Sequence, residues 1–388
     1  MPVPRDILLI GAGLGGLTAA IGLARAGCRV RVFEQSARLG EVGAGITMSS
    51  GAMRCFELLG LAAEVEAISS VSSSLPYLHY RSGELLRRGL GDRAPGARVR
   101  AARQVHRADL HALLLATLRH LAPDTIVLGR RFISMSQDEA GVVARFEGGE
   151  TVAGALLVGC DGGRSAVRRD LLGDWPLEFA GQVAFRCLVP GELPAARVAS
   201  RGGAVYVGPG ATFNRYPLRG GALINCVGLV RTADWTDEGW NTPATHAEVL
   251  ERFKDWHPEL LGLIAAAPLQ GLIKWGLFQR DPLPRWTAGR ATLLGDAAHP
   301  MLPFLGLGAA MAIEDATVLG RAIAAHGDCG AALQRYEDAR RPRATRIYRQ
   351  SIEQGRLSQA VDPARYADAP APAHDPSFFD YDPASIAL

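Results

Sequence analysis

A glycine-rich turn near the start of the chain constrains the fold more than any other feature. Residues 7–10 are Ile, Leu, Leu and Ile, an apolar run typical of a buried parallel strand, and residues 17–25 have the composition of a helix. Residues 11–16 between them follow the pattern G-x-G-x-x-G, and Glu34 closes the next predicted strand. This order of strand, turn, helix, strand and acid predicts a dinucleotide site.

Each part of this motif has a physical role. The first glycine allows the tight turn, the second lets the backbone approach a pyrophosphate, and the third allows close contact between helix and strand. The helix N-terminus then faces the phosphates, and Glu34 can accept hydrogen bonds from a ribose diol. An acid here disfavours the 2′-phosphate of NADP, but it does not separate FAD from NAD.

Later segments point to FAD. Residues 295–300 read G-D-A-A-H-P after a predicted buried strand, where a carboxylate can hold a ribityl chain. Residues 306–308 contain two glycines at a predicted helix start, whose N–H groups can face a flavin ring. Residues 160–162 read C-D-G after another strand, and Arg103 and Arg107 lie near a helix start, where they can meet a pyrophosphate.

Short strands with Gly and Pro turns dominate residues 176–231 and interrupt the α/β pattern. The predicted fold is therefore α/β, a Rossmann-like FAD-binding domain with an inserted antiparallel-sheet substrate domain and a C-terminal helix. The predicted boundaries are residues 1–75, 95–175 and 275–320 for the FAD-binding domain, 76–94 and 176–274 for the sheet domain, 321–356 for the C-terminal helical segment and 357–388 for a tail.

The C-terminal part of the chain is rich in charged residues and proline. The tail from about residue 357 is rich in Pro and Asp and is predicted to be an extended coil on the surface. Before it, a charged helix face is expected to carry Arg335, Arg340, Arg341 and Arg343 with Glu337 and Asp338.

The composition disfavours several classes of protein. Of 388 residues 48% are hydrophobic, and the net charge is +3, so neither a disordered chain nor a nucleic-acid partner is expected. Residues 7–24 carry no charge, but five glycines argue against a membrane span. With no export signal, the six cysteines are expected to be reduced thiols in the cytoplasm. No group of His, Cys, Asp and Glu has metal-ligand spacing, so no metal is predicted.

The motifs resemble those of the single-component FAD-dependent aromatic hydroxylases of the para-hydroxybenzoate hydroxylase type. The resemblance rests on the glycine turn with Glu34, on residues 159–162 (G-C-D-G) and on residues 295–300, in the order of that family. Supporting stretches lie at residues 40–46, 105–110 and 309–316. Within the family the chain looks most like the salicylate, 3-hydroxybenzoate and 6-hydroxynicotinate monooxygenases.

This resemblance implies an activity and a set of site residues. FAD would be reduced by NADH or NADPH as a transient co-substrate and would react with O2 to give a flavin C4a-hydroperoxide. That species would hydroxylate a small phenolic or hydroxy-heteroaromatic substrate, carrying a carboxyl group, in aromatic compound catabolism. The implied cofactor-binding residues are Gly11, Gly13, Leu14, Gly16, Glu34, Gln35, Gly45, Arg107, Asp161, Gly162, Asp296, Pro303, Gly306, Gly308 and Ala309. The implied substrate pocket contains Thr212, Asn214, Tyr216 and Leu307, with Tyr216 as the catalytic residue.

Three positions depart from the family pattern. The resemblance implies a histidine where this chain has Thr212, a glutamine where it has Leu307, and often an asparagine where it has Gly51. These departures indicate a more apolar pocket or a substrate with fewer hydroxyls, and neutral drift with the same substrate is the alternative. Arg186 is either structural or a partner for a substrate carboxylate.

Two other classes of function compete with hydroxylation. One is an FAD-dependent oxidoreductase that inserts no oxygen, such as a dehydrogenase or reductase. The other, a non-enzymatic nucleotide sensor, is disfavoured because the three cofactor motifs are retained. The expected partners are a small aromatic substrate, NAD(P)H and O2, and the chain is expected to be a monomer or homodimer. The substrate, the ring position, any decarboxylation, the catalytic base and the choice of NADH or NADPH stay open.

Overall fold

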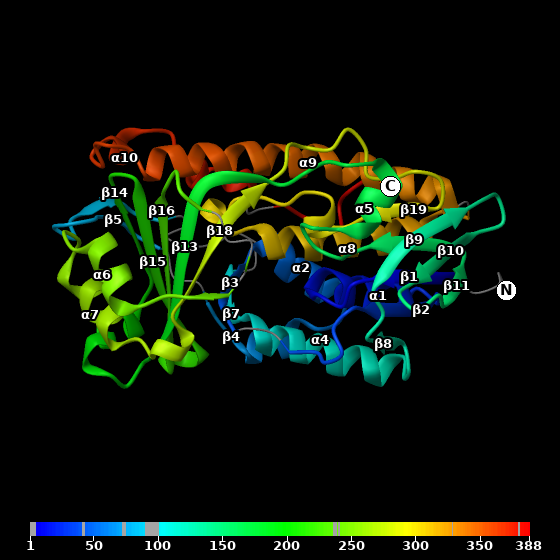
Figure 1. Ribbon diagram of the computed structural model, residues 1–388, viewed down its shortest axis with the longest axis horizontal. Coiled ribbons are helices and arrows are strands. Elements are labelled where there is room, and N and C mark those ends of the chain that lie inside the picture. The colour runs from blue at the N-terminus through cyan, green and yellow to red at the C-terminus, as the bar shows by residue number, and fades with distance from the viewer. Residues whose placement is uncertain are drawn as a thin grey trace.

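A computed structural model describes residues 5–40, 43–71, 75–89, 101–235, 239, 241–327, 329–378 and 381–388. A parallel sheet with its helices lies toward one end of the molecule and a large, mostly antiparallel sheet lies toward the other (Figure 1). This arrangement confirms the predicted α/β class, while the domain boundaries stay a prediction. Within the described residues, no helix has the length and the apolar composition needed to cross a membrane.

The parallel sheet brings four sequence motifs to one edge. Its order is β19-β12-β1-β2-β8, and every neighbouring pair is parallel. The strands are β1 (Asp6–Ile10), β2 (Arg29–Glu34), β8 (Ile126–Leu128), β12 (Leu156–Gly159) and β19 (Ala291–Leu293). Because parallel strands share one carboxyl edge, the glycine turn after β1 lies there with Glu34, Asp161 and Asp296.

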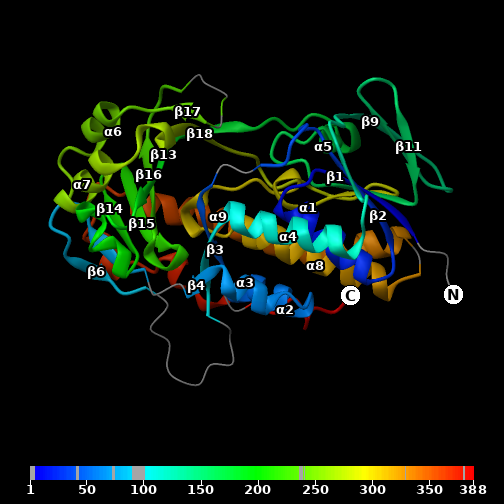
Figure 2. The same cartoon turned by 90° about the horizontal axis from the view of Figure 1, so that it is seen from below.

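Helices and small sheets surround this parallel sheet. Helix α1 contacts both α4 and α8, and the three run together in Figure 2. Gly15 permits the close approach of α1 and α8, since a Cβ there would lie 3.2 Å from the Ala312 Cβ. The helices are α1 (Leu14–Arg25), α2 (Ser50–Leu58), α3 (Ala62–Ala67), α4 (Arg107–Leu121), α5 (Ala166–Leu172) and α8 (Gly308–Ala325). The two small antiparallel sheets are β9 (Phe132–Gln137), β10 (Val142–Phe146) and β11 (Thr151–Gly154), and β3 (Gly45–Met48), β4 (Ser69–Val71) and β7 (Arg103–His106).

Within the part of the chain that the structure describes, the large sheet has eight strands in the order β17-β18-β13-β16-β15-β14-β5-β6. One face packs on helices α6 (His246–Phe253) and α7 (Pro258–Ala266) through a core that includes Phe213, Phe253 and Leu260. The other face is turned toward β3 and toward the segment before α8. The strands are β5 (Tyr77–His79), β6 (Leu85–Arg87), β13 (Glu178–Pro190), β14 (Ala204–Gly208), β15 (Ala211–Leu218), β16 (Leu223–Arg231), β17 (Thr242–Pro243) and β18 (Ile273–Gln279).

The C-terminal segment differs from its prediction. Helix α9 (Cys329–Ser358) runs along the molecule past the parallel sheet and the large sheet (Figure 1). The chain then forms the short helix α10 (Arg365–Asp368) and returns over the fold. Tyr366 and Phe378 are 1% and 2% exposed, so the prediction of an extended surface coil is wrong for this part of the tail. Apolar side chains spaced along the Pro-rich segment hold it on the fold.

The expected charged face of α9 is also partly buried. Arg340 is 0% exposed and pairs with Glu314 at 2.9 Å and Asp315 at 2.7 Å, both on α8. Glu337 is 2% exposed and accepts two backbone hydrogen bonds from the segment before β19. The prediction of a charged helix face is therefore wrong for these two residues, which are buried. Arg340 pairs with acids of α8, and Glu337 accepts hydrogen bonds from backbone that is distant in sequence.

Gly51 makes room for the end of the chain. A Cβ at this position of α2 would lie 2.7 Å from the Tyr381 carbonyl oxygen and 2.8 Å from Glu314 Oε1. The Tyr381 ring also stacks on the Arg343 guanidinium, with 3.9 Å between the guanidinium carbon and the ring centroid. The glycine that departs from the family pattern thus permits contact between α2 and the C-terminal residues.

Gly51→Asn is therefore expected to lower the free energy of unfolding by about 1–3 kcal/mol, because the new side chain overpacks this contact. Chymotryptic cleavage after Tyr381, followed by mass spectrometry, should become faster. Gly22→Ala in α1 is the control, since its Cβ would lie 3.5 Å from the Leu59 side chain, an ordinary contact. Equal cleavage rates in Gly51→Asn and the parent protein would contradict this account.

Candidate active site

The glycine turn combines tight packing with one open position. At Gly11 φ is +109°, and a Cβ would lie 2.4 Å from the Cys160 carbonyl oxygen. At Gly16 a Cβ would lie 2.1 Å from the Gly11 carbonyl oxygen. Gly13, directly before Leu14 and α1, has no atom within 4 Å of its Cβ position. The open space at a helix N-terminus, bounded by two closely packed glycines, fits the pyrophosphate of FAD.

Glu34 lies beside this turn in a fixed orientation. Its carboxylate accepts hydrogen bonds from the N–H groups of Ala12 and Ser36, each at 2.9 Å. The neighbouring Gln35 is exposed, and its Oε1 accepts a hydrogen bond from Arg131 at 2.9 Å. His111, for which the sequence carried no signal of this role, contacts the Ala12 carbonyl oxygen through Nε2 at 2.8 Å. Helix α4 therefore supports the turn from one side.

Asp161 stabilises the start of α5. Its carboxylate accepts hydrogen bonds from Ser165 Oγ at 2.5 Å and from the N–H groups of Ala166 and Val167 at 2.7 and 3.1 Å. Burial raises the pKa of Asp161, and these hydrogen bonds oppose that shift. The adjacent Gly162 has φ of +79° and open space at its Cβ position. Asp161 thus has a structural role, and its predicted contact with FAD stays a prediction.

Asp296 and Arg107 interact electrostatically at the carboxyl edge of the parallel sheet. The Asp296 side chain is open to solvent, yet enough protein surrounds it that desolvation raises its pKa. Attraction to His299 and Arg107 opposes this rise, which places the Arg107 guanidinium within electrostatic reach of the carboxylate. Arg103, the other arginine considered for the pyrophosphate, donates hydrogen bonds to Ser69 and to a carbonyl of α3. Arg103 is therefore engaged with protein groups, and the predicted contact of Arg107 with the pyrophosphate stays a prediction.

The start of α8 offers backbone groups to a ligand. A 3-10 turn (Pro303–Leu305) ends at Gly306, which has φ of +66°, and α8 begins at Gly308 and Ala309. No atom lies within 4 Å of the Cβ positions of Gly306 and Gly308, and the first N–H groups of a helix lack intrahelical partners. Leu307 between them is only 2% exposed and packs in the main core, so its place in the substrate pocket stays a prediction.

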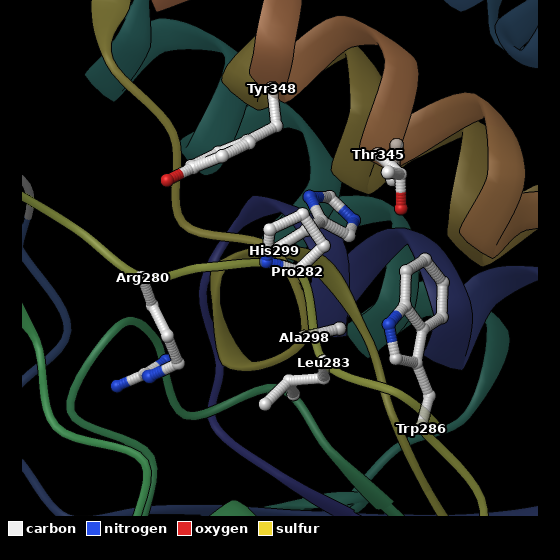
Figure 3. A pocket seen from close by; sticks show the side chains of 9 residues that line it. Arg280, Pro282, Leu283, Trp286, Ala298, His299, Thr345 and Tyr348 are labelled. Atoms are coloured by element: carbon white, nitrogen blue, oxygen red, sulfur yellow. The ribbon is translucent and has the colours of Figure 1, made fainter.

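A buried charge network holds the loop that carries Asp296. Asp315 of α8 accepts hydrogen bonds from the Gly295 N–H at 3.1 Å and from Arg340 Nε at 2.7 Å. Its Oδ2 also lies 2.5 Å from His299 Nε2. The His299 ring packs at a tilt against Trp286, with 5.2 Å between ring centroids, beside α9 (Figure 3). His299 therefore has a structural role at the strand–loop turn.

Two cavities lie among the described residues, and neither suits a substrate next to the cofactor. The cavity in Figure 3, lined by His299 and Tyr348 among others, has a volume of about 10 Å³, enough for one water molecule. A larger cavity of about 360 Å³ is lined by Val183, Phe185 and Trp235. Val183 and Phe185 pack with the core under α6 and α7, so this cavity lies on the α6 and α7 side of the large sheet.

The inner face of the large sheet carries the predicted substrate residues. Side chains alternate along β15, and Thr212, Asn214 and Tyr216 point away from the core under α6 and α7. Tyr216 lies against β3, since a Cβ at Gly45 would be 2.6 Å from its hydroxyl oxygen. Asn225, across from Tyr216 on β16, accepts a hydrogen bond from the Gly45 N–H at 2.8 Å. The structure thus brings Tyr216 and Gly45 together, and sequence reasoning missed Asn225.

Comparisons with known proteins agree with this arrangement. The family model described as "FAD binding domain" matches residues 5–351. The chain is 35% identical to 3-amino-4-hydroxybenzoate 2-monooxygenase of Streptomyces platensis, over 91% of this chain and 88% of the relative. It is 36% identical to 6-hydroxynicotinate 3-monooxygenase of Bordetella bronchiseptica, over 90% of each chain. A crystal structure of Klebsiella pneumoniae HpxO with FAD and uric acid matches with a TM-score of 0.82 and 27% identity, over 93% of this chain and 90% of that one.

The glycine turn, Glu34 and the open start of α8 supply a cradle that fits FAD, and the family match covers most of the chain. The predicted role of each residue toward the cofactor stays a prediction. The chain belongs to the FAD-dependent aromatic-ring monooxygenases of the FAD-binding-domain family.

Proposed function

We propose that this protein uses NAD(P)H and O2 to hydroxylate a small phenolic or hydroxy-heteroaromatic acid. The observation that carries the proposal is the set of polar side chains on the inner face of β15, where Asn214 and Tyr216 point away from α6 and α7. Asn214 Oδ1 is buried and has no hydrogen-bond partner, which is costly unless a ligand supplies a donor. The named substrates of two relatives, 3-amino-4-hydroxybenzoate and 6-hydroxynicotinate, are both hydroxylated aromatic acids.

The protein's own residues bind, orient and shield the reactants. FAD, when bound, supplies the chemistry of accepting a hydride from NAD(P)H and activating O2. Glu34 and the N-terminus of α1 would hold its adenosine end, and Arg107 and Asp296 its pyrophosphate and ribityl region. The inner face of the sheet would cover the substrate and exclude water, so that the reactive centre and the ring meet in a dry site.

Tyr216 would act as a neutral phenol that orients the substrate. Burial raises the pKa of Tyr216 well above its usual range, although attraction to Arg186 opposes the rise. The hydroxyl therefore keeps its proton at neutral pH and can donate a hydrogen bond to a substrate oxygen. Such a bond orients the ring and does not remove the phenolic proton of the substrate.

The overall test is a substrate screen of the purified holoenzyme. FAD is confirmed by its absorption spectrum, and NADH and NADPH oxidation is measured with hydroxybenzoates, hydroxypyridine carboxylates and related phenols, with product masses alongside. Stimulated oxidation and a product heavier by one oxygen atom are expected. Stimulated oxidation with a product that has gained no oxygen would instead establish a dehydrogenase or reductase.

Tyr216→Phe is expected to reduce hydroxylated product per NAD(P)H oxidised by about 2- to 10-fold and to raise hydrogen peroxide release, because one orienting hydrogen bond is lost. The phenyl ring still packs against Gly45, so the melting temperature should not change. Tyr206→Phe is the control, because the Tyr206 hydroxyl donates to Glu259 at 2.7 Å on the opposite face of the sheet. The assignment of Tyr216 fails if both variants couple oxidation to hydroxylation as the parent does.

A further inference from the structure

Three residues form a half-exposed row across the inner face of the large sheet. Arg186 of β13 lies opposite Val227 of β16, and Val227 lies opposite Asn214 of β15. Directly opposed residues of antiparallel strands point to the same face, so the three side chains share the inner face. Since neighbouring strands are about 4.8 Å apart, the α-carbons of Arg186 and Asn214 are separated by roughly 10 Å, with Val227 between them.

The rows on either side are buried by cofactor-binding elements. On one side Ala184, Leu229 and Thr212 are 0%, 1% and 2% exposed, and the row packs against Leu302 and Phe304 in the segment before α8.

On the other side Asn225 and Tyr216 are 0% and 8% exposed, beneath Gly45 of β3. The three residues of the middle row keep intermediate exposure. Solvent therefore reaches the inner face at this row, between the two segments predicted to contact FAD.

The two ends of this row differ in chemistry. Among the described residues no Asp or Glu forms an ion pair with Arg186, whose guanidinium carbon lies 4.9 Å from the centroid of the Trp275 ring. Burial lowers the pKa of Arg186, and the charge of Arg107 adds to the effect. An anion bound here would offset both costs. At the other end, Asn214 Oδ1 is a buried acceptor without a donor.

We propose that Arg186 binds the carboxylate of the substrate and that Asn214 accepts a hydrogen bond from a hydroxyl or amino group elsewhere on the ring, which lies over Val227. This inference rests on the proposed function and deepens it. The site selects planar aromatic acids that carry a hydrogen-bond donor away from the carboxylate. Arginine suits this role because its planar guanidinium can donate two parallel hydrogen bonds to one carboxylate.

The test compares acids with their uncharged amides in the holoenzyme. The probes are 3- and 4-hydroxybenzoate and the corresponding carboxamides, titrated without NAD(P)H, with binding followed by the change in flavin absorbance. Arg186→Gln is expected to raise the Kd of the acids about 10- to 100-fold and to leave the Kd of the amides unchanged. Arg186→Lys should restore part of the preference for acids. Arg252→Gln, at an exposed arginine on α6, is the matched control and should change neither Kd.

A second variant tests the other end of the row. Asn214→Ala is expected to weaken binding of 4-hydroxybenzoate about 2- to 10-fold and to leave binding of unsubstituted benzoate unchanged. Equal losses for acids and amides in Arg186→Gln would overturn the inference. Loss of FAD from that variant would also overturn it, because Arg186 would then hold the cofactor. A parent holoenzyme that binds no acid in preference to its amide is a third contrary result.

Product analysis of the same mixtures with NAD(P)H separates this inference from the proposed function. Acids that bind in an Arg186-dependent manner but gain no oxygen would contradict the proposed function and leave the role of Arg186 intact. Oxygenated acids whose Kd does not respond to Arg186→Gln would contradict the role of Arg186 alone.

Discussion

Gly16→Ala is expected to lower the free energy of unfolding by about 3 kcal/mol, because the new methyl group would meet backbone that cannot move aside. Its Cβ would lie 2.1 Å from the Gly11 carbonyl oxygen, far inside van der Waals contact. Gly11 is itself held by a hydrogen bond from its N–H to the Phe33 carbonyl oxygen at 2.8 Å. Relief of the clash would separate α1 from β1 and open the turn. FAD retention should be lost together with stability.

Gly13→Ala provides the matched comparison within the same motif. Gly13 has φ of −73° and ψ of −178°, which alanine adopts without strain, and its Cβ position is open. We expect the apoprotein to unfold at the same or a slightly higher denaturant concentration. FAD affinity should fall by about tenfold or more, because the methyl group occupies the space next to the helix N-terminus.

Urea unfolding of both apoproteins and flavin titration measure the two effects separately. Equal stability losses in the two variants would show that Gly13 is a packing position. Undiminished FAD binding by Gly13→Ala would place the pyrophosphate elsewhere.

Asp315→Asn is expected to lower the free energy of unfolding by about 3–5 kcal/mol, because it leaves a buried cation without one of its counter-charges. Arg340 is 0% exposed, and Asp315 accepts its Nε hydrogen bond. The same carboxylate holds the Gly295 N–H and contacts His299. The loop carrying Asp296 should therefore loosen, and FAD affinity should fall as well. Asp338→Asn is the control, because Asp338 is exposed on α9 and should change stability by less than about 0.5 kcal/mol.

The effect of Asp315 should depend on pH with a defined sign. Burial opposes its ionisation, but the charges of His299 and Arg340 and their hydrogen bonds outweigh burial and lower the pKa of Asp315 to about 2. An unfolded aspartate has a pKa of about 3.9. This depressed pKa contributes about 2–3 kcal/mol of stability that is present above pH 4 and is lost as the pH falls from about 4 to 2. The stability difference between parent and Asp315→Asn should therefore shrink over that range. A difference that stays constant from pH 6 to pH 2.5 would contradict this account.

Features that depend on short stretches of chain were predictable from the sequence. The apolar strand β1, the turn at residues 11–16 and helix α1 are specified by residues close to one another, and Glu34 follows at a set spacing. The meeting of Glu34, Asp161 and Asp296 at one edge was also predictable, because parallel strands share their carboxyl edge. The family resemblance rests on the same local motifs and is confirmed by the family match.

Features that depend on pairing between distant segments were decided only by the tertiary structure. A charged face was a sound expectation for α9, but the contact of α9 with α8 buries Arg340 against Asp315. Likewise, no pattern in the sequence shows that Gly51 must leave room for Tyr381 at the other end of the chain.

The candidate substrate site shows the same division. The sequence by itself determined which motifs lie at the carboxyl edge of the parallel sheet, because turn geometry and strand direction are local properties. Only strand register placed Arg186 in one row with Asn214, and a slip of one residue would turn either side chain to the opposite face. Register is set by the packing of the whole sheet on α6, α7 and the cofactor-binding elements, so it is decided by tertiary structure and not by local sequence.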